Sequence, residues 1–114
     1  MFTATALLDT GATVSGIGPR VIAGLGLKSY AKNRLGSATE ERFVDCYLFR
    51  LGLFSTEQVA LEQLGPGDLP FIFGDLDGFS WSRIADFDVI LGMDVLSRCD
   101  LDISRAGRCT LTFG

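Results

Sequence analysis

Two segments carry residue types that can do chemistry, and the first surrounds Asp9. The run from Leu7 to Thr13 places a carboxylate directly after apolar residues and before a short loop of small and hydroxyl-bearing residues. A carboxylate at the mouth of a buried strand is partly desolvated, which raises the free-energy cost of its charge and suits activation of water. Gly11 lets a substrate or a second backbone approach closely, and Thr10 offers a hydroxyl that can hold the loop. One carboxylate cannot act as both acid and base, whereas two that face each other can share a proton.

The second segment, Val89 to Leu96, lies near the end of the chain. The run 88–91 is typical of a buried strand, Gly92 interrupts it, and Met93 to Arg98 is predicted to form a short helix. Asp94 is interpreted only as a helix-start residue that the helix dipole favours.

The elements that must position these segments are mostly strands. Strands are predicted over Phe2–Leu8 and Val14–Ile17, followed by a short helix that begins at Pro19 and ends near Gly26. A long hairpin is expected over Lys28–Leu53, with its turn at 35–39.

The second half is predicted to contain a strand over Glu57–Leu64 and one short strand around Phe71–Phe73, within the interrupted segment 65–77. A final hairpin is expected because Leu101 and Ile103 alternate on one arm, and Cys109, Leu111 and Phe113 on the other. The turn falls on Arg105-Ala106-Gly107. The chain therefore reads as a single, mainly β domain over residues 1–114.

Composition excludes several classes of site. The 114 residues carry a net charge of −4 and no histidine, so Ser-His-Asp and Cys-His catalysis and the commonest zinc ligand are absent. The sequence contains no stripe of basic residues, so we expect no nucleic-acid partner. No secretory signal and no apolar run of transmembrane length is found, so we expect a cytoplasmic protein without a membrane partner. The three cysteines are expected to be core or partly buried thiols in a reducing compartment.

Other notable side chains have simpler interpretations. The aspartates at 75, 77, 86 and 88 are expected to be loop and solubilising groups, because their spacing matches no calcium loop, and no metal site is predicted. Core or dimer packing is the favoured role of four aromatic residues, with a substrate pocket left open as the alternative. These are Phe71, Phe73, Phe79 and Trp81.

The two segments together resemble the retropepsin-like aspartic proteases. The loop Asp9-Thr10-Gly11-Ala12-Thr13 matches the D-[ST]-G-A-[ST] pattern of that family, and Ile90-Leu91-Gly92 resembles the hydrophobic-hydrophobic-glycine element behind the loop. The continuation from Gly92 to Leu96 is similar to that of cellular and bacterial members. The 28–53 hairpin falls where the family has its flap. The resemblance implies a retropepsin-like acid protease barrel, one lobe per chain.

The resemblance also implies roles for individual residues. Asp9 is the expected catalytic aspartate, one from each subunit of a homodimer, with Thr10 linking the two loops and Gly11 bonding an extended polypeptide substrate. The residues expected to bind substrate are Ala12, Thr13, Gly36, Ser37, Ala38 and Thr39. Leu91 and Gly92 are expected to support the site structurally. The implied reaction needs no cofactor. Only eight residues precede Asp9, fewer than is usual in the family, so either the sequence is trimmed at its start or the dimer interface relies mainly on the C-terminal strand 108–113.

Two alternatives compete with this interpretation. Aspartate followed by threonine and glycine also occurs in phosphate loops of sugar-kinase and actin-like ATPases, but those folds need two large domains and this chain has no P-loop sequence. The stronger alternative is a catalytically inactive retropepsin-like dimerisation or peptide-binding module. The residues Glu40, Glu41 and Arg42 in place of a glycine cluster in the flap favour it, whereas the intact Asp9-Thr10-Gly11 favours an enzyme.

Overall fold

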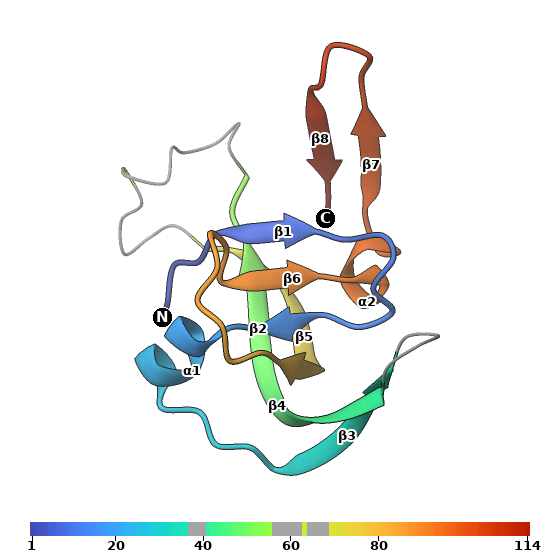
Figure 1. Ribbon diagram of the computed structural model, residues 1–114. Coiled ribbons are helices and arrows are strands. Elements are labelled where there is room, and N and C mark those ends of the chain that lie inside the picture. The colour runs from blue at the N-terminus through green and yellow to red at the C-terminus, as the bar shows by residue number, and fades with distance from the viewer. Residues whose placement is uncertain (37–40, 56–62, 64–68) are drawn as a thin grey trace.

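The computed structural model describes residues 1–36, 41–55, 63 and 69–114, and Figure 1 shows that strands dominate it. The strands are β1 (Ala6–Leu8), β2 (Gly16–Ile17), β3 (Ala31–Gly36), β4 (Glu41–Leu53), β5 (Phe71–Ser80), β6 (Val89–Leu91), β7 (Asp100–Ile103) and β8 (Cys109–Thr112). The helices are α1 (Pro19–Leu25) and α2 (Met93–Leu96). The mainly β prediction is therefore correct. Neither helix of the described residues is long and apolar enough to cross a membrane.

Six strands form one sheet in the order β1-β6-β2-β5-β4-β3. Strand β6 lies between β1 and β2, parallel to β1 and antiparallel to β2, with Leu8 opposite Leu91 and Gly16 opposite Ile90. The loop 9–15, which joins β1 to β2, must therefore pass around the end of β6. Strands β1 and β3 stand at opposite ends of the order and do not pair with each other in the described part of the chain. A closed barrel accordingly stays a prediction.

The core lies against one face of β6. Val89 and Leu91 are buried there, and they pack with Ile17 of β2 and with Val95 and Leu96 of α2. Side chains alternate between the two faces of a strand. The residue between the two buried ones, Ile90, therefore points to the opposite face, where it is only half-buried.

Helix α1 has the ends that the sequence predicts. Pro19 occupies the first turn, where its missing N–H leaves no hydrogen bond unmade. Gly26 follows the helix with φ 63°. Its N–H bonds to the carbonyl of Ala23, and the N–H of the next residue, Leu27, bonds to the carbonyl of Ile22. A left-handed residue at this position favours glycine, which explains the abrupt end.

The hairpin expected over 28–53 is formed by β3 and β4, from Ala31 opposite Cys46 to Gly36 opposite Glu41. Most of the predicted turn falls on residues 37–40, which lie outside the described residues. Strand β4 continues beyond the hairpin and pairs with β5, with an irregularity between Arg50 and Gly52.

Strand β5 corrects the sequence prediction. Instead of a short strand around residues 71–73, ten residues from Phe71 to Ser80 are extended. Pairing with β4 overrides the glycines that made this segment look interrupted. At Gly78 the missing side chain is needed, since a Cβ atom would lie 2.5 Å from the Ser15 carbonyl oxygen and 2.7 Å from the Phe49 ring. The predicted 57–64 strand falls, apart from residue 63, outside the described residues.

Three other elements are shorter than predicted: the Phe2–Leu8 strand begins at Ala6, the Val14–Ile17 strand at Gly16, and the Met93–Arg98 helix ends at Leu96. Before β1, the Thr5 carbonyl accepts hydrogen bonds from the N–H groups of Asp88 and Val89. The start of the chain is thus fastened to β6 without forming further strand.

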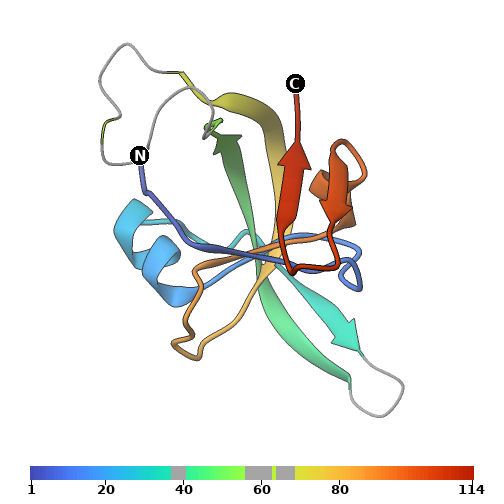
Figure 2. The same ribbon diagram turned by 90° about the horizontal axis from the view of Figure 1, so that it is seen from above.

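The C-terminal hairpin forms as predicted, with Leu101 opposite Leu111 and Ile103 opposite Cys109. It is a separate two-stranded sheet that extends away from the larger one, as Figures 1 and 2 show. The three cysteines are free thiols, but the expectation that all of them are core or partly buried is wrong for Cys109. Cys46 is buried, Cys99 half-buried and Cys109 exposed.

Candidate active site

Asp9 stands at the first position after β1, and the backbone around it is fixed. Its N–H donates to the carbonyl of Leu91 at 3.0 Å, so the strand pairing extends to this residue. Its carboxylate Oδ1 accepts the N–H of Gly11 at 2.9 Å, and its carbonyl accepts the N–H of Ala12 at 3.2 Å. These bonds form a tight turn that holds the half-buried carboxylate in a single orientation.

The far side of the loop is fastened to the start of α2. Met93 N–H donates to the Ala12 carbonyl at 2.7 Å, and Asp94 N–H donates to the Thr13 carbonyl at 3.2 Å. Gly92 makes this approach possible. A Cβ atom on Gly92 would lie 2.6 Å from the carbonyl of Val14 and 2.9 Å from that of Ala12, closer than real Cβ atoms come. Gly92 thus packs directly behind the loop.

A buried polar network joins the end of the loop to α2, and it corrects the narrow interpretation of Asp94. Ser15 is fully buried, and its N–H and hydroxyl donate to the two carboxylate oxygens of Asp94 at 2.9 and 2.6 Å. The Ser15 hydroxyl oxygen in turn accepts the N–H of Gly92 at 3.0 Å. Asp94 does lie in the first turn of α2, as predicted, but its carboxylate accepts hydrogen bonds from the end of the loop and so holds the loop in place. No local pattern signals a contact between residues so far apart in the sequence.

The predicted site residues fall into two groups. The five residues 9–13 form one loop, with Leu91 and Gly92 directly behind it. Gly36 ends β3, and Figures 1 and 2 show this end of the hairpin on the same side of the molecule as the loop. The remaining three, Ser37, Ala38 and Thr39, lie outside the described residues.

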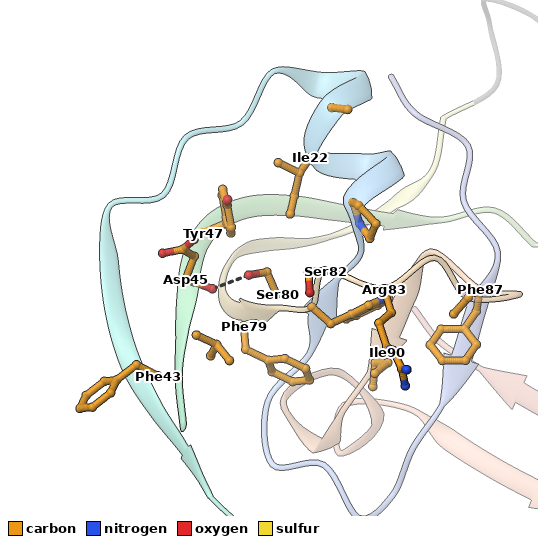
Figure 3. Close-up of a pocket in the computed structure, with 15 residues that line it drawn as sticks. Ile22, Phe43, Asp45, Tyr47, Phe79, Ser80, Ser82, Arg83, Phe87 and Ile90 are labelled. Atoms are coloured by element: carbon orange, nitrogen blue, oxygen red, sulfur yellow. Dashed lines mark hydrogen bonds between the residues drawn. The ribbon is translucent and has the colours of Figure 1, made fainter. Parts of the chain in front are cut away.

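A pocket of about 760 Å³ lies on the face of β6 opposite the core, where Ile90 lines it. Figure 3 shows it between α1, the start of β4 and the segment 81–87. The four aromatic residues for which the sequence leaves a pocket role open fall into two pairs. Phe79 and Trp81 line this pocket, whereas Phe71 and Phe73 pack together and against Phe113 at the base of the C-terminal hairpin.

The acidic residues interpreted as solubilising also divide. Asp88 is buried, accepts the N–H of Thr5 at 3.3 Å and pairs with Arg20 at 3.5 Å, so it is structural. Asp75, by contrast, forms an exposed ion pair with Arg50 at 3.1 Å. Within the described ranges, no group of three or more acidic or thiol side chains is arranged to hold a metal ion.

Asp77 lies at the base of the hairpin, where its carboxylate meets the exposed Tyr30. The hydrogen bond from the phenol to this carboxylate raises the pKa of Tyr30 to about 12. The bond favours the protonated phenol, because ionised tyrosine beside a carboxylate would place two negative charges together.

Comparison with known proteins adds one finding. The sequence model of the aspartyl protease family matches residues 3–95, a range that contains both the Asp9 loop and the Gly92 element. No curated protein and no solved structure gives a significant match. Since the matched range covers most of the chain, the protein belongs to the aspartyl protease family, within the retropepsin-like clan.

Proposed function

We propose that the protein is an aspartic endopeptidase that activates water with two Asp9 carboxylates, one from each subunit of a homodimer. The observation that carries the proposal is the state of the Asp9 side chain. Oδ1 accepts the Gly11 N–H, and no donor of the described residues bonds to Oδ2. The carboxylate is therefore oriented by its own loop and keeps one oxygen for water or for a second carboxylate.

The second carboxylate is proposed to come from another copy of the chain. Within one chain, the acidic side chain fastened to the loop is Asp94, and both of its oxygens already accept hydrogen bonds from Ser15. Its carboxylate is thus committed to holding the loop rather than placed for acid–base work. Two Asp9 side chains on a two-fold axis would supply the acid and the base that hydrolysis needs.

The chemistry then follows from one shared proton. The ionised Asp9 takes a proton from water as the water oxygen attacks the peptide carbonyl carbon, and the protonated Asp9 gives its proton to the carbonyl oxygen. The resulting gem-diol collapses, the C–N bond breaks, and the leaving nitrogen takes a proton from the dyad. No covalent intermediate, metal or cofactor is involved.

The described surface includes apolar groups suited to self-association. On the C-terminal hairpin, Leu101, Ile103, Cys109 and Leu111 share one face by register. Leu111 packs against the core, whereas Ile103 at the far end is 75% exposed. An isolated two-stranded hairpin is marginal in water, so pairing with a second chain would stabilise it. Exposed Leu7, Val14 and Met93 surround the Asp9 loop and add to this surface.

Under this proposal, the other site residues hold the substrate. Thr10 would link the loops of the two subunits, and Gly11 to Thr13 would bond the backbone of an extended peptide. The 28–53 hairpin would act as the flap, with residues 36–39 closing over the peptide and excluding water. The free thiols fit a reducing compartment, and we propose the cytoplasm.

The test is cleavage of a diverse peptide mixture from acidic to neutral pH by the wild-type chain and by Asp9→Asn. Asp75→Asn is the matched control, because its carboxylate is 71% exposed and lies outside the site. We expect the wild type and the control to cleave and Asp9→Asn to be inactive. Cleavage at equal rates by all three would refute Asp9 catalysis. A confirmed dimer that cleaves nothing would favour the inactive peptide-binding module.

A further inference from the structure

The hairpin of β3 and β4 stands out from the sheet with few contacts to hold its angle. Residues 41–45 of β4 pair only with β3 among the described strands, because the pairing of β4 with β5 begins at Cys46, opposite Phe79. Figure 2 shows the two strands extending away from the rest of the sheet. We call residues 31–36 and 41–45 the hairpin arm, and its root is the place where Cys46 lies opposite both Ala31 and Phe79.

Two side-chain hydrogen bonds lie at the root. The Ser80 hydroxyl donates to the Asp45 carbonyl at 2.8 Å, which ties the end of β5 to β4 (Figure 3). The Tyr30 phenol donates to the carboxylate of Asp77, a residue of β5. Tyr30 directly precedes β3, and its N–H donates to the Cys46 carbonyl at 3.2 Å. Because β4 lies between β3 and β5 in the sheet, the contact of Tyr30 with Asp77 reaches across a whole strand and joins the arm directly to β5.

Asp77 and Asp75 lie on the same strand but have different partners. Asp75 pairs with Arg50, directly opposite on β4, at 3.1 Å. Asp77 lies opposite Leu48, which has no polar side chain, and no lysine or arginine of the described residues forms an ion pair with Asp77. Its carboxylate instead accepts the phenol of Tyr30, and a hydrogen bond to a charged acceptor is stronger than one between neutral groups.

A small rotation at the root has a large effect at the far end of the arm. Strand β3 has six residues, so the arm is about 20 Å long at about 3.3 Å per residue. A rotation of about 10° at the root moves the far end by about 3.5 Å, more than the length of a hydrogen bond. Figures 1 and 2 show this end on the same side of the molecule as the Asp9 loop. The angle of the arm therefore sets the space left for a peptide at Asp9.

We propose that Tyr30 and Asp77 are positioning residues, whose contact fixes the angle of the hairpin arm over the Asp9 loop and so keeps the chain ready to bind a polypeptide. This inference rests on the proposed function. Tyr30 is 51% exposed, so water competes for the hydrogen bond and the bond adds little to the stability of the fold. Its effect on binding is larger, because an arm that pivots spends only part of its time at the angle that accepts a peptide. The apparent affinity falls by that fraction.

Residual dipolar couplings of the backbone amides measure the order of the arm relative to β5 without any cleavage. In the wild type, the order parameters of both should be about 0.85, and those of the arm should fall to about 0.6 in Tyr30→Phe, which keeps the ring and removes the hydroxyl. Asp75→Asn is the matched control, because it removes another exposed contact between β4 and β5 and should leave the arm ordered. Equal order of the arm in Tyr30→Phe and the wild type overturns the proposal.

A double substitution tests whether the two residues act as one contact. Tyr30→Phe, Asp77→Ala and the double variant should lower the order of the arm equally, since each removes the same bond. Asp77→Asn keeps an acceptor oxygen and should recover part of the order. Effects of the two single changes that add in the double variant would mean that each residue acts separately, and this would overturn the proposal.

Cleavage kinetics connect the arm to the proposed function. On a peptide that the wild type cleaves, KM should rise about threefold or more in Tyr30→Phe and Asp77→Ala, with kcat unchanged because the Asp9 loop is not altered. Asp75→Asn should keep the wild-type KM. An unchanged KM in variants whose arm has lost order overturns the positioning role and leaves the protease proposal intact. If the wild type cleaves nothing, the proposed function fails, and the order parameters still decide whether the contact holds the arm.

Discussion

The loop 9–15 and the C-terminal hairpin differ in how the rest of the chain holds them. The loop is bonded on both sides, to Leu91 through Asp9 and to α2 through Ala12, Thr13 and Ser15. The hairpin pairs only with itself among the described strands, and it packs on the domain through Leu111 and Phe113 at its base.

This difference means that one chain positions the Asp9 carboxylate by itself but needs a second chain to complete the proposed site. The Asp9 carboxylate is oriented within a single chain, whereas the surface proposed to receive a second chain is left apolar and open. Dimerisation is therefore expected to bring a second carboxylate to a loop that is already formed. Substitutions behind the loop should damage both the fold and the activity, and substitutions at the end of the hairpin should damage association alone.

The largest effect is expected from Gly92→Ala. The new methyl group would meet the backbone of Val14 at 2.6 Å, and backbone cannot move aside cheaply. We expect a loss of about 3 kcal/mol of unfolding free energy, the upper part of the range for overpacking, and no proteolysis. Denaturant unfolding measures the first quantity. Gly11→Ala is the matched comparison, because its methyl group would meet only Asp9 Oδ1 at 3.3 Å. An equally large loss of unfolding free energy in Gly11→Ala would contradict the claim that the close backbone contact at Gly92 is what requires glycine.

Next in size is Asp94→Ala, which leaves the N–H and the hydroxyl of the fully buried Ser15 without acceptors. The expected cost is about 2 kcal/mol, since an unsatisfied buried donor typically costs about 1–3 kcal/mol. Asp94→Asn keeps one acceptor oxygen and should recover part of the loss. The exposed Asp75→Asn should change stability by less than about 0.5 kcal/mol. If Asp94→Ala unfolds no more easily than Asp75→Asn, the network does not hold the loop.

A smaller effect, on association rather than on folding, is expected from Ile103→Asp. This side chain is 75% exposed at the end of the hairpin, so a charge should barely alter the stability of one chain. It should weaken self-association about tenfold or more, because a charge in an apolar interface loses hydration without gaining a partner. Sedimentation velocity measures the change. Thr110→Asp adds the same charge on the polar face of the hairpin, and an equal loss in both variants would argue against the apolar face as the interface.

The smallest effect is expected at the exposed hydrogen bond between Tyr30 and Asp77. This bond lies outside both the loop 9–15 and the C-terminal hairpin, so it serves as a reference for the contacts within them. The pKa of Tyr30 is raised from 10.0 to about 12, so the folded state retains this proton longer than the unfolded chain. The stabilisation is fully present below pH 10 and is lost as the pH rises through 12. Ultraviolet titration, with Tyr30→Phe subtracted, should show this late ionisation, and Asp77→Ala should move it to lower pH. If the pKa of Tyr30 is unchanged in Asp77→Ala, the hydrogen bond to Asp77 is not what raises it.

Local sequence was sufficient for elements that end on special residues. Pro19 and Gly26 delimit α1 because each has the backbone preference that its position needs. The two hairpins were predictable because alternating apolar residues flank turn-forming ones. The Asp9 loop and Gly92 were recognisable because their residue types are dictated by chemistry and by a close backbone approach.

The remainder depended on contacts between distant segments. Strand β5 was underestimated because the glycines and prolines of the segment 65–77 look like breaks, yet pairing with β4 keeps the chain extended from Phe71 to Ser80. The role of Asp94 was missed because Ser15 lies 79 positions away along the chain. The pocket that Phe79 and Trp81 line is built from α1, β4, β5, β6 and the segment 81–87, so the sequence around Trp81 could not show whether this ring lines a pocket.

The central claim, that two Asp9 side chains form one site, is tested most directly by subunit mixing. Wild-type chain and Asp9→Asn are mixed in equal amounts at fixed total concentration, allowed to exchange, and assayed on a cleaved peptide. If both carboxylates are required and subunits pair at random, the activity should fall to about one quarter of that of the undiluted wild type. If each chain acts alone, it should fall only to about one half. A value near one quarter supports the shared site, and a value near one half contradicts it.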